Sequence, residues 1–143
     1  MPRHTFPIWA AALILATQSV VAQESDISGR LSIELNATET MGDTCKLTFL
    51  ITNGTEIAID KIVYETVLFD SDGQVDRLTL FDFGTLPPAR PRVRQFVIPQ
   101  TTCEQLGRVL FNSANTCEGA GLDPRVCESG LMPSSRTEIE VLG

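Results

Sequence analysis

Residues 61–83 read KIVYETVLFDSDGQVDRLTLFDF, and this stretch decides the fold of the chain. Its first part, Lys61–Phe69, is rich in β-branched and aromatic residues, which favour a strand. The sequence DSDG at Asp70–Gly73 is typical of a turn, and a second strand is expected over Val75–Phe83. One face of that second strand carries Leu78 and Leu80, and the other carries Val75, Arg77, Thr79, Phe81 and Phe83. The stretch therefore predicts two consecutive strands joined by a tight turn.

The same kind of pattern occurs on both sides of this stretch. Apolar and polar residues alternate along LSIELN (31–36) and along KLTFLIT (46–52), and Asn53-Gly54 ends the latter with a turn signal. Further strands are expected at Arg92–Ile98, Arg108–Asn112 and Thr137–Leu142, with a short helical turn at Thr102–Gly107. No amphipathic helix is found. These features predict an all-β, two-sheet sandwich of about seven strands.

The N-terminus has the pattern of a secretory signal. Arg3 and His4 are positively charged or titratable, Ile8–Leu15 is apolar but too short to span a membrane, and Val20–Ala22 offers small residues for cleavage. Met1–Ala22 is therefore predicted to be a cleaved signal peptide, and residues 23–143 to be a single, soluble, periplasmic domain. The alternative is an uncleaved membrane anchor.

Four cysteines in an exported chain favour two disulfides. No CxxC motif occurs, and the long gap from Cys45 to Cys103 disfavours a zinc site. With the strands taken in chain order, Cys45 and Cys103 lie at the starts of two strands at the same end of the sandwich. Cys117 and Cys127 both fall in the connection before the last strand. We therefore predict the pairs Cys45–Cys103 and Cys117–Cys127.

The charge and composition of the chain argue against several classes of function. The formal net charge of −7 disfavours binding to nucleic acid or anionic lipid, and no second apolar segment predicts membrane insertion after signal removal. Removal of the signal takes away His4, the only histidine, and with it the commonest general base and metal ligand. We therefore expect no enzyme activity and no cofactor.

Two groups of charged residues are candidate sites. Arg90, Arg92 and Arg94 form a basic group on an acidic chain and are a possible partner-binding surface, with edge-strand protection as the alternative. Asp70, Asp72 and Asp76 around the turn are a weak calcium candidate. The spacing lacks ligands of an EF-hand, so a plain turn is favoured and no metal site is expected.

The stretch from Leu47 to Pro99 also resembles a known family. Its features are Asn53-Gly54-Thr55, the turn that follows Leu68-Phe69, and Leu86-Pro87-Pro88 before a strand that ends near Phe96. It is similar to the FxLYD-type and related immunoglobulin-like domains of bacterial envelope proteins, with Phe69 in place of the usual Tyr, and to a small exported family of unknown function. The resemblance implies that the predicted sandwich is immunoglobulin-like and that the domain is non-catalytic.

Together these observations favour an exported periplasmic protein that acts through contact with a protein partner. Its expected role is that of an accessory or stabilising component of an envelope complex. The alternative is a module that binds a small ligand or calcium.

Overall fold

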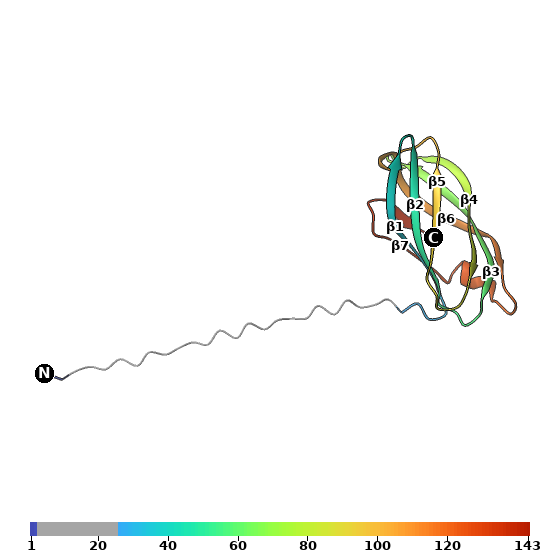
Figure 1. Cartoon of the computed structure of the whole chain (residues 1–143), viewed down its shortest axis with the longest axis horizontal. Helices are drawn as coiled ribbons and strands as arrows, with labels where there is room; N and C mark the ends of the chain where they lie inside the picture. The colour runs from blue at the N-terminus through green and yellow to red at the C-terminus, as the bar shows by residue number, and fades with distance from the viewer. Residues whose placement is uncertain (3–25) are drawn as a thin grey trace.

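The protein, seen here as a computed structural model, is described at residues 1–2 and 26–143 (Figure 1). Nearly all of the predicted signal peptide lies outside these residues. From residue 26 onward the chain forms eight strands: β1 (Leu31–Met41), β2 (Thr44–Asn53), β3 (Ile59–Asp70), β4 (Val75–Leu86), β5 (Arg92–Ile98), β6 (Leu106–Glu118), β7 (Leu131–Ser135) and β8 (Glu140–Leu142). Two short 3-10 helices, η1 (Cys103–Gln105) and η2 (Pro124–Cys127), precede β6 and β7. No helix among the described residues is long and apolar enough to cross a membrane.

The strands form two four-stranded sheets that pack face to face. Sheet A has the order β5-β2-β1-β7 and sheet B the order β4-β3-β6-β8. Most neighbours are antiparallel, whereas β1 pairs with β7 and β6 with β8 in parallel. The two-sheet sandwich predicted from the sequence is therefore confirmed.

The core lies between the sheets, where alternate residues of each strand are buried. Every second residue is buried along β2 and along the first half of β1, where Leu31, Ile33 and Leu35 have no exposed surface. Phe49 of β2 lies among aromatic side chains from both sheets, with ring centroids 5.7–6.0 Å from those of Phe81, Phe83, Phe96 and Phe111. Tilted and edge-on aromatic contacts of this kind add to the stabilisation from apolar burial.

The C-terminal strands differ from the sequence-based expectation. Strand β7 was not expected, and Thr137–Leu142 is strand only from Glu140 onward. Residues 136–139 instead form a turn in which the Thr137 hydroxyl accepts a hydrogen bond from the Ile139 amide (3.1 Å). Strand β7 is five residues long and contains Pro133, which is tolerated because β7 is an edge strand.

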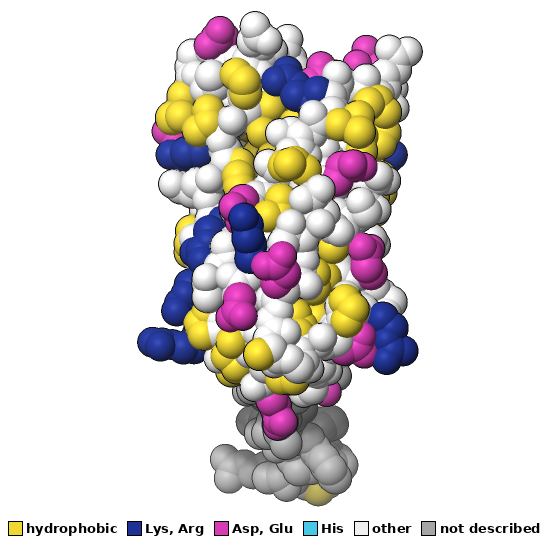
Figure 2. All heavy atoms as spheres, turned by 90° about the vertical axis from the view of Figure 1, so that its right-hand side faces the viewer, with side chains coloured by type: hydrophobic (Ala, Val, Ile, Leu, Met, Phe, Trp, Pro, Cys, Tyr) yellow, Lys and Arg dark blue, Asp and Glu magenta, His cyan; other side chains and the backbone are white. Residues whose placement is uncertain are grey.

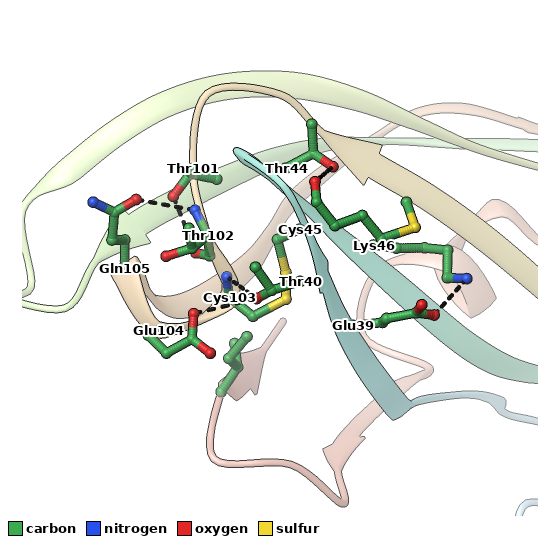
Figure 3. Close-up of a disulfide and its surroundings, with 12 residues drawn as sticks. Glu39, Thr40, Thr44, Cys45, Lys46, Thr101, Thr102, Cys103, Glu104 and Gln105 are labelled. Carbon is green, nitrogen blue, oxygen red and sulfur yellow. Dashed lines mark hydrogen bonds and ion pairs between the residues drawn. A yellow bond between two sulfur atoms is a disulfide. The ribbon is translucent and has the colours of Figure 1, made fainter.

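Both predicted disulfides are present. Cys45 is bonded to Cys103 with Cα atoms 4.8 Å apart, and Cys117 to Cys127 with Cα atoms 6.3 Å apart. The first joins β2 of sheet A to η1, which leads into sheet B (Figure 3), and the Thr40 hydroxyl accepts a hydrogen bond from the Cys103 amide beside it (3.0 Å). Two structural disulfides indicate a protein of an oxidising compartment.

Candidate functional site

Strands β4 and β5 form one open side of the sandwich. They are consecutive in the chain, but β4 is the edge strand of sheet B and β5 the edge strand of sheet A. Their inward-facing rings meet, because Phe81 stacks on Phe96 with centroids 4.2 Å apart and an interplanar angle of 3°. We call this side, residues 75–99, the β4–β5 edge.

Arginine side chains connect the two strands across this edge. Arg94 of β5 donates hydrogen bonds to the carbonyl oxygens of Phe83 (2.8 Å) and Thr85 (3.2 Å) in β4. In the opposite direction, Arg77 of β4 donates to the carbonyl oxygen of Pro99 (2.7 Å), just beyond β5. Arg94 therefore occupies edge carbonyls of β4 that another strand would otherwise use.

The first half of β4 lacks this cover. A shallow groove of about 250 Å³ runs between Arg77–Phe81 of β4 and Phe96–Pro99 at the end of β5. Because β4 is an edge strand, one row of its backbone groups faces away from β3 along this segment. The uncovered part of the edge is therefore about one short strand in length.

Exposed apolar side chains surround the uncovered segment. Leu78 and Leu80, on the outer face of β4, are 61% and 56% exposed, and Val97 of β5 is 53% exposed. In the cross-strand row that starts at Leu78, Val67 of β3 is buried (7% exposed), and apolar side chains are accessible again only at Leu110 and Leu142. Figure 2 shows this side of the molecule, with hydrophobic side chains spread over sheet B and several Lys and Arg side chains along its left margin. A group of exposed, large apolar side chains around one groove, such as Leu78, Leu80 and Val97, often marks an interaction site.

The three arginines predicted as a partner-binding group all lie at the β4–β5 edge but have different surroundings. Arg94 covers backbone carbonyls, as edge protection requires. Arg92 donates only to the carbonyl of its neighbour Pro91 (3.2 Å), and Arg90 is exposed in the loop before β5. Arg77 joins them on this edge. Arg108 lies elsewhere, on β6, where it forms an ion pair with Glu140 (2.8 Å) and lies over the Phe69 ring.

The acidic residues of the β3–β4 turn are used within the turn itself. The Asp70 carboxylate accepts hydrogen bonds from the amides of Asp72 (2.9 Å) and Gln74 (3.0 Å). Asp76 forms an ion pair with Arg77 (2.6 Å). Residues 26–143 contain no group of three or more His, Cys, Asp or Glu side chains placed to hold a metal ion. The turn is thus a hairpin connection built by Asp70.

A second hollow, which the sequence did not indicate, lies at the end of the sandwich where residues 29–30 lead into β1. It has a volume of about 450 Å³ and is formed by three turns that are distant in sequence. We call it the end pocket. Its lining residues come from segments 29–30, 55–57 and 121–130, and no short motif connects these segments.

Comparison with known proteins yields two similar solved structures. No protein-family model and no curated protein matches the chain. IrmA from Escherichia coli is 15% identical, with 73% of this chain and 90% of that chain covered and a TM-score of 0.48. Cj0090 from Campylobacter jejuni is 11% identical, with 61% and 85% covered and a TM-score of 0.37.

Proposed function

We propose that this is an exported periplasmic protein that acts by binding a protein partner through the β4–β5 edge. In this role it is an accessory or stabilising component of an envelope complex. The proposal includes no catalytic step and no cofactor, because the only histidine of the sequence, His4, lies in the predicted signal peptide. The resemblance to envelope immunoglobulin-like domains is consistent with such a role.

The observation that carries the proposal is the uncovered first half of β4 beside Leu78 and Leu80. An edge strand with free backbone groups accepts an added strand, and neighbouring side chains then select the sequence of that strand. Natural proteins usually cover such edges, as Arg94 covers the second half of β4. An uncovered segment with exposed leucines is therefore a docking site for an extended segment of a partner.

The charges along this edge indicate the partner's chemistry. Four arginines (Arg77, Arg90, Arg92 and Arg94) and two aspartates (Asp76, which is paired with Arg77, and Asp82) lie in residues 75–99, so this edge is net positive on a chain whose net charge is −7. Guanidinium groups that remain exposed, such as that of Arg90, attract carboxylates. We therefore expect the docking segment to combine apolar side chains, which pack on Leu78 and Leu80, with Asp or Glu.

Quantitative affinity capture from a cell extract tests the proposal. The bait is compared with the variant Leu78→Lys/Leu80→Lys, which places two charges on the apolar surface. A matched control, Met41→Lys/Ala120→Lys, adds the same charge at exposed positions away from the edge. We expect at least one protein that the wild type and the control retain and the edge variant loses. Identical sets of captured proteins from all three baits would reject the β4–β5 edge as the binding surface.

A further inference from the structure

The end pocket has two walls that the fold holds in place. The first wall is the crossing of residues 29–30 with the turn at Gly54. The Gly29 amide donates to the Gly54 carbonyl (2.8 Å), and the Gly54 amide donates to the Arg30 carbonyl (2.8 Å). A side chain at Gly54 would collide with the carbonyl oxygens of Ile27 and Arg30, so this close crossing requires glycine.

The second wall is η2 and the loop after it. The Cys117–Cys127 disulfide ties η2 to β6, and the buried Tyr64 hydroxyl donates to the Cys127 carbonyl (2.8 Å). The Leu31 amide donates to the Gly130 carbonyl (3.0 Å), which joins this wall to β1. Both walls are thus fixed by covalent or backbone bonds, and a ligand would not have to order them.

The pocket combines apolar lining with cationic groups. Ile57, Leu122 and Val126 supply apolar surface, and Thr55 and Ser129 add hydroxyl groups. A volume of about 450 Å³ falls in the range of small-ligand sites, roughly 300–1,000 Å³.

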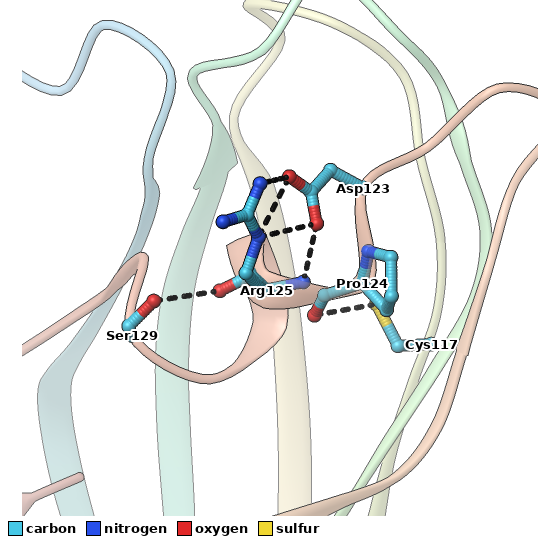
Figure 4. Close-up of polar contacts among 5 residues, drawn as sticks. All are labelled: Cys117, Asp123, Pro124, Arg125 and Ser129. Carbon is cyan, nitrogen blue, oxygen red and sulfur yellow. Dashed lines mark hydrogen bonds and ion pairs between the residues drawn. The ribbon is translucent and has the colours of Figure 1, made fainter.

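Two guanidinium groups and one carboxylate give the lining a net positive charge. Arg30 donates one hydrogen bond from Nη2 to the Leu131 carbonyl (3.2 Å). Arg125 donates from Nε and Nη2 to Asp123, the shortest contact being 2.6 Å, and its remaining terminal nitrogen has no such bond in Figure 4. Each arginine has five N–H donors, so both keep donors for a ligand.

We propose that the end pocket binds a ligand with a single carboxylate and a small apolar group. The carboxylate pairs with the free donors of Arg30 and Arg125, and the apolar group covers Ile57, Leu122 and Val126. Either a free carboxylic acid or the C-terminus of a peptide carries this chemistry. The site is separate from the β4–β5 edge, so it stands or falls independently of the proposed function.

Titration with N-acetyl-leucine, followed by amide chemical shifts of the isotope-labelled protein, tests the site. We expect saturable shifts at Gly121, Ser129 and Gly130, which line the pocket. N-acetyl-leucinamide, which lacks the carboxylate, should bind about 10-fold more weakly or not at all. A short acetylated peptide ending in leucine distinguishes the two sources, since tighter binding than the single residue identifies a chain terminus.

Variants make the test specific to charge. Arg30→Gln should weaken binding of the acid about 10-fold, because it removes a charged donor. Asp123→Asn should strengthen binding, because it releases Arg125 and removes a negative charge, while the asparagine oxygen still accepts from the Arg125 amide. Arg136→Gln, at an exposed ion pair with Glu34, is the control and should leave binding unchanged.

Several results would overturn the proposal. They are the absence of saturable shifts, equal binding of the acid and the amide, and unchanged affinity in the folded Arg30→Gln variant. Weaker binding in Asp123→Asn would also contradict it.

Discussion

The two open sides of the sandwich protect the exposed backbone groups of their edge strands in different ways. On each side, two consecutive strands belong to different sheets and leave backbone groups at the sheet edges. On one side, β7 and β8 are five and three residues long. On the other, β4 and β5 have twelve and seven residues. The short strands limit the number of exposed edge groups by their length alone, which is a common form of edge protection.

The long β4–β5 edge relies on side chains instead. Arg94 reaches from one sheet to carbonyl groups of the other, and Arg77 bonds back in the opposite direction. Arg94 covers carbonyl groups in the second half of β4, whereas Arg77 in the first half bonds to Pro99 and does not cover the β4 backbone, which stays open beside exposed leucines. The contrast shows that the uncovered segment is not a general feature of this sandwich, which is why we assign it the binding role.

Removal of each disulfide in turn should give the largest difference in unfolding free energy between the two sides of the sandwich. Cys45 pairs across the sheet with Ile98 of β5, whereas Cys127 ends η2 just before β7. The bridges span sequence separations of 58 and 10 residues. From chain entropy, Cys45→Ala/Cys103→Ala should cost about 4 kcal/mol and Cys117→Ala/Cys127→Ala about 2.7 kcal/mol of unfolding free energy. Denaturant unfolding measures both, and a larger loss from the local bridge would contradict the entropic reasoning.

Tyr64→Phe should loosen the β7 side. The hydroxyl of this buried side chain bonds to the Cys127 carbonyl at 2.8 Å. Its loss leaves a buried acceptor unpaired and should cost about 1–3 kcal/mol, measured by thermal or denaturant unfolding.

The stability of the folded protein should also depend on pH through Tyr64. Burial, with a smaller contribution from Glu128, raises its pKa, whereas an unfolded tyrosine titrates near pH ~10. The associated stability is therefore present below pH ~10 and is lost as the pH rises above it. Because Tyr64 is the only tyrosine in the sequence, tyrosinate absorbance should appear together with unfolding in an alkaline titration. Tyrosinate that forms while the protein remains folded would contradict its burial.

Arg94→Gln should expose the second half of β4. It removes charged hydrogen bonds to the carbonyls of Phe83 and Thr85 and should cost about 1 kcal/mol. The uncovered edge should also make the protein self-associate more readily, as measured by sedimentation. Arg92→Gln is the matched control, since Arg92 bonds only to the adjacent Pro91 carbonyl. Equal effects of the two substitutions would show that Arg94 is not an edge cap.

Leu78→Lys/Leu80→Lys should have the smallest effect on stability. Both side chains point outward and are more than half exposed, so the unfolding free energy should change by about 0.5 kcal/mol or less. Denaturant unfolding checks this result. A loss of several kcal/mol would mean that these leucines belong to the core rather than to a binding surface.

The sequence predicted those features that depend on neighbouring residues. The alternation in Leu31–Leu35 and the turn at Asp70–Gly73 correctly indicated strands and a hairpin, because burial of one face follows a two-residue period. The disulfide pairs were predicted correctly from the order of the strands, although Cys117 lies within β6 and not in the connection after it. Leu78 and Leu80 were correctly placed on the face opposite Phe81 and Phe83.

Features that depend on distant segments were not predictable. Strand β7 is short and contains Pro133. It joins sheet A by parallel pairing with β1, which is about 100 residues away in sequence. The link from Arg94 to Phe83 crosses between sheets, so no local pattern encodes it. The end pocket likewise arises where three separated turns meet.

Site-specific photo-cross-linking tests the central claim most directly. A photoreactive amino acid is placed at Leu80, in the uncovered part of β4, and separately at Ser134, an exposed residue of the short β7 edge. Both proteins are expressed and irradiated in the cell. We predict a covalent adduct with a partner protein from position 80 and none from position 134. The same adducts from both positions, or an adduct from position 134 alone, would contradict the account.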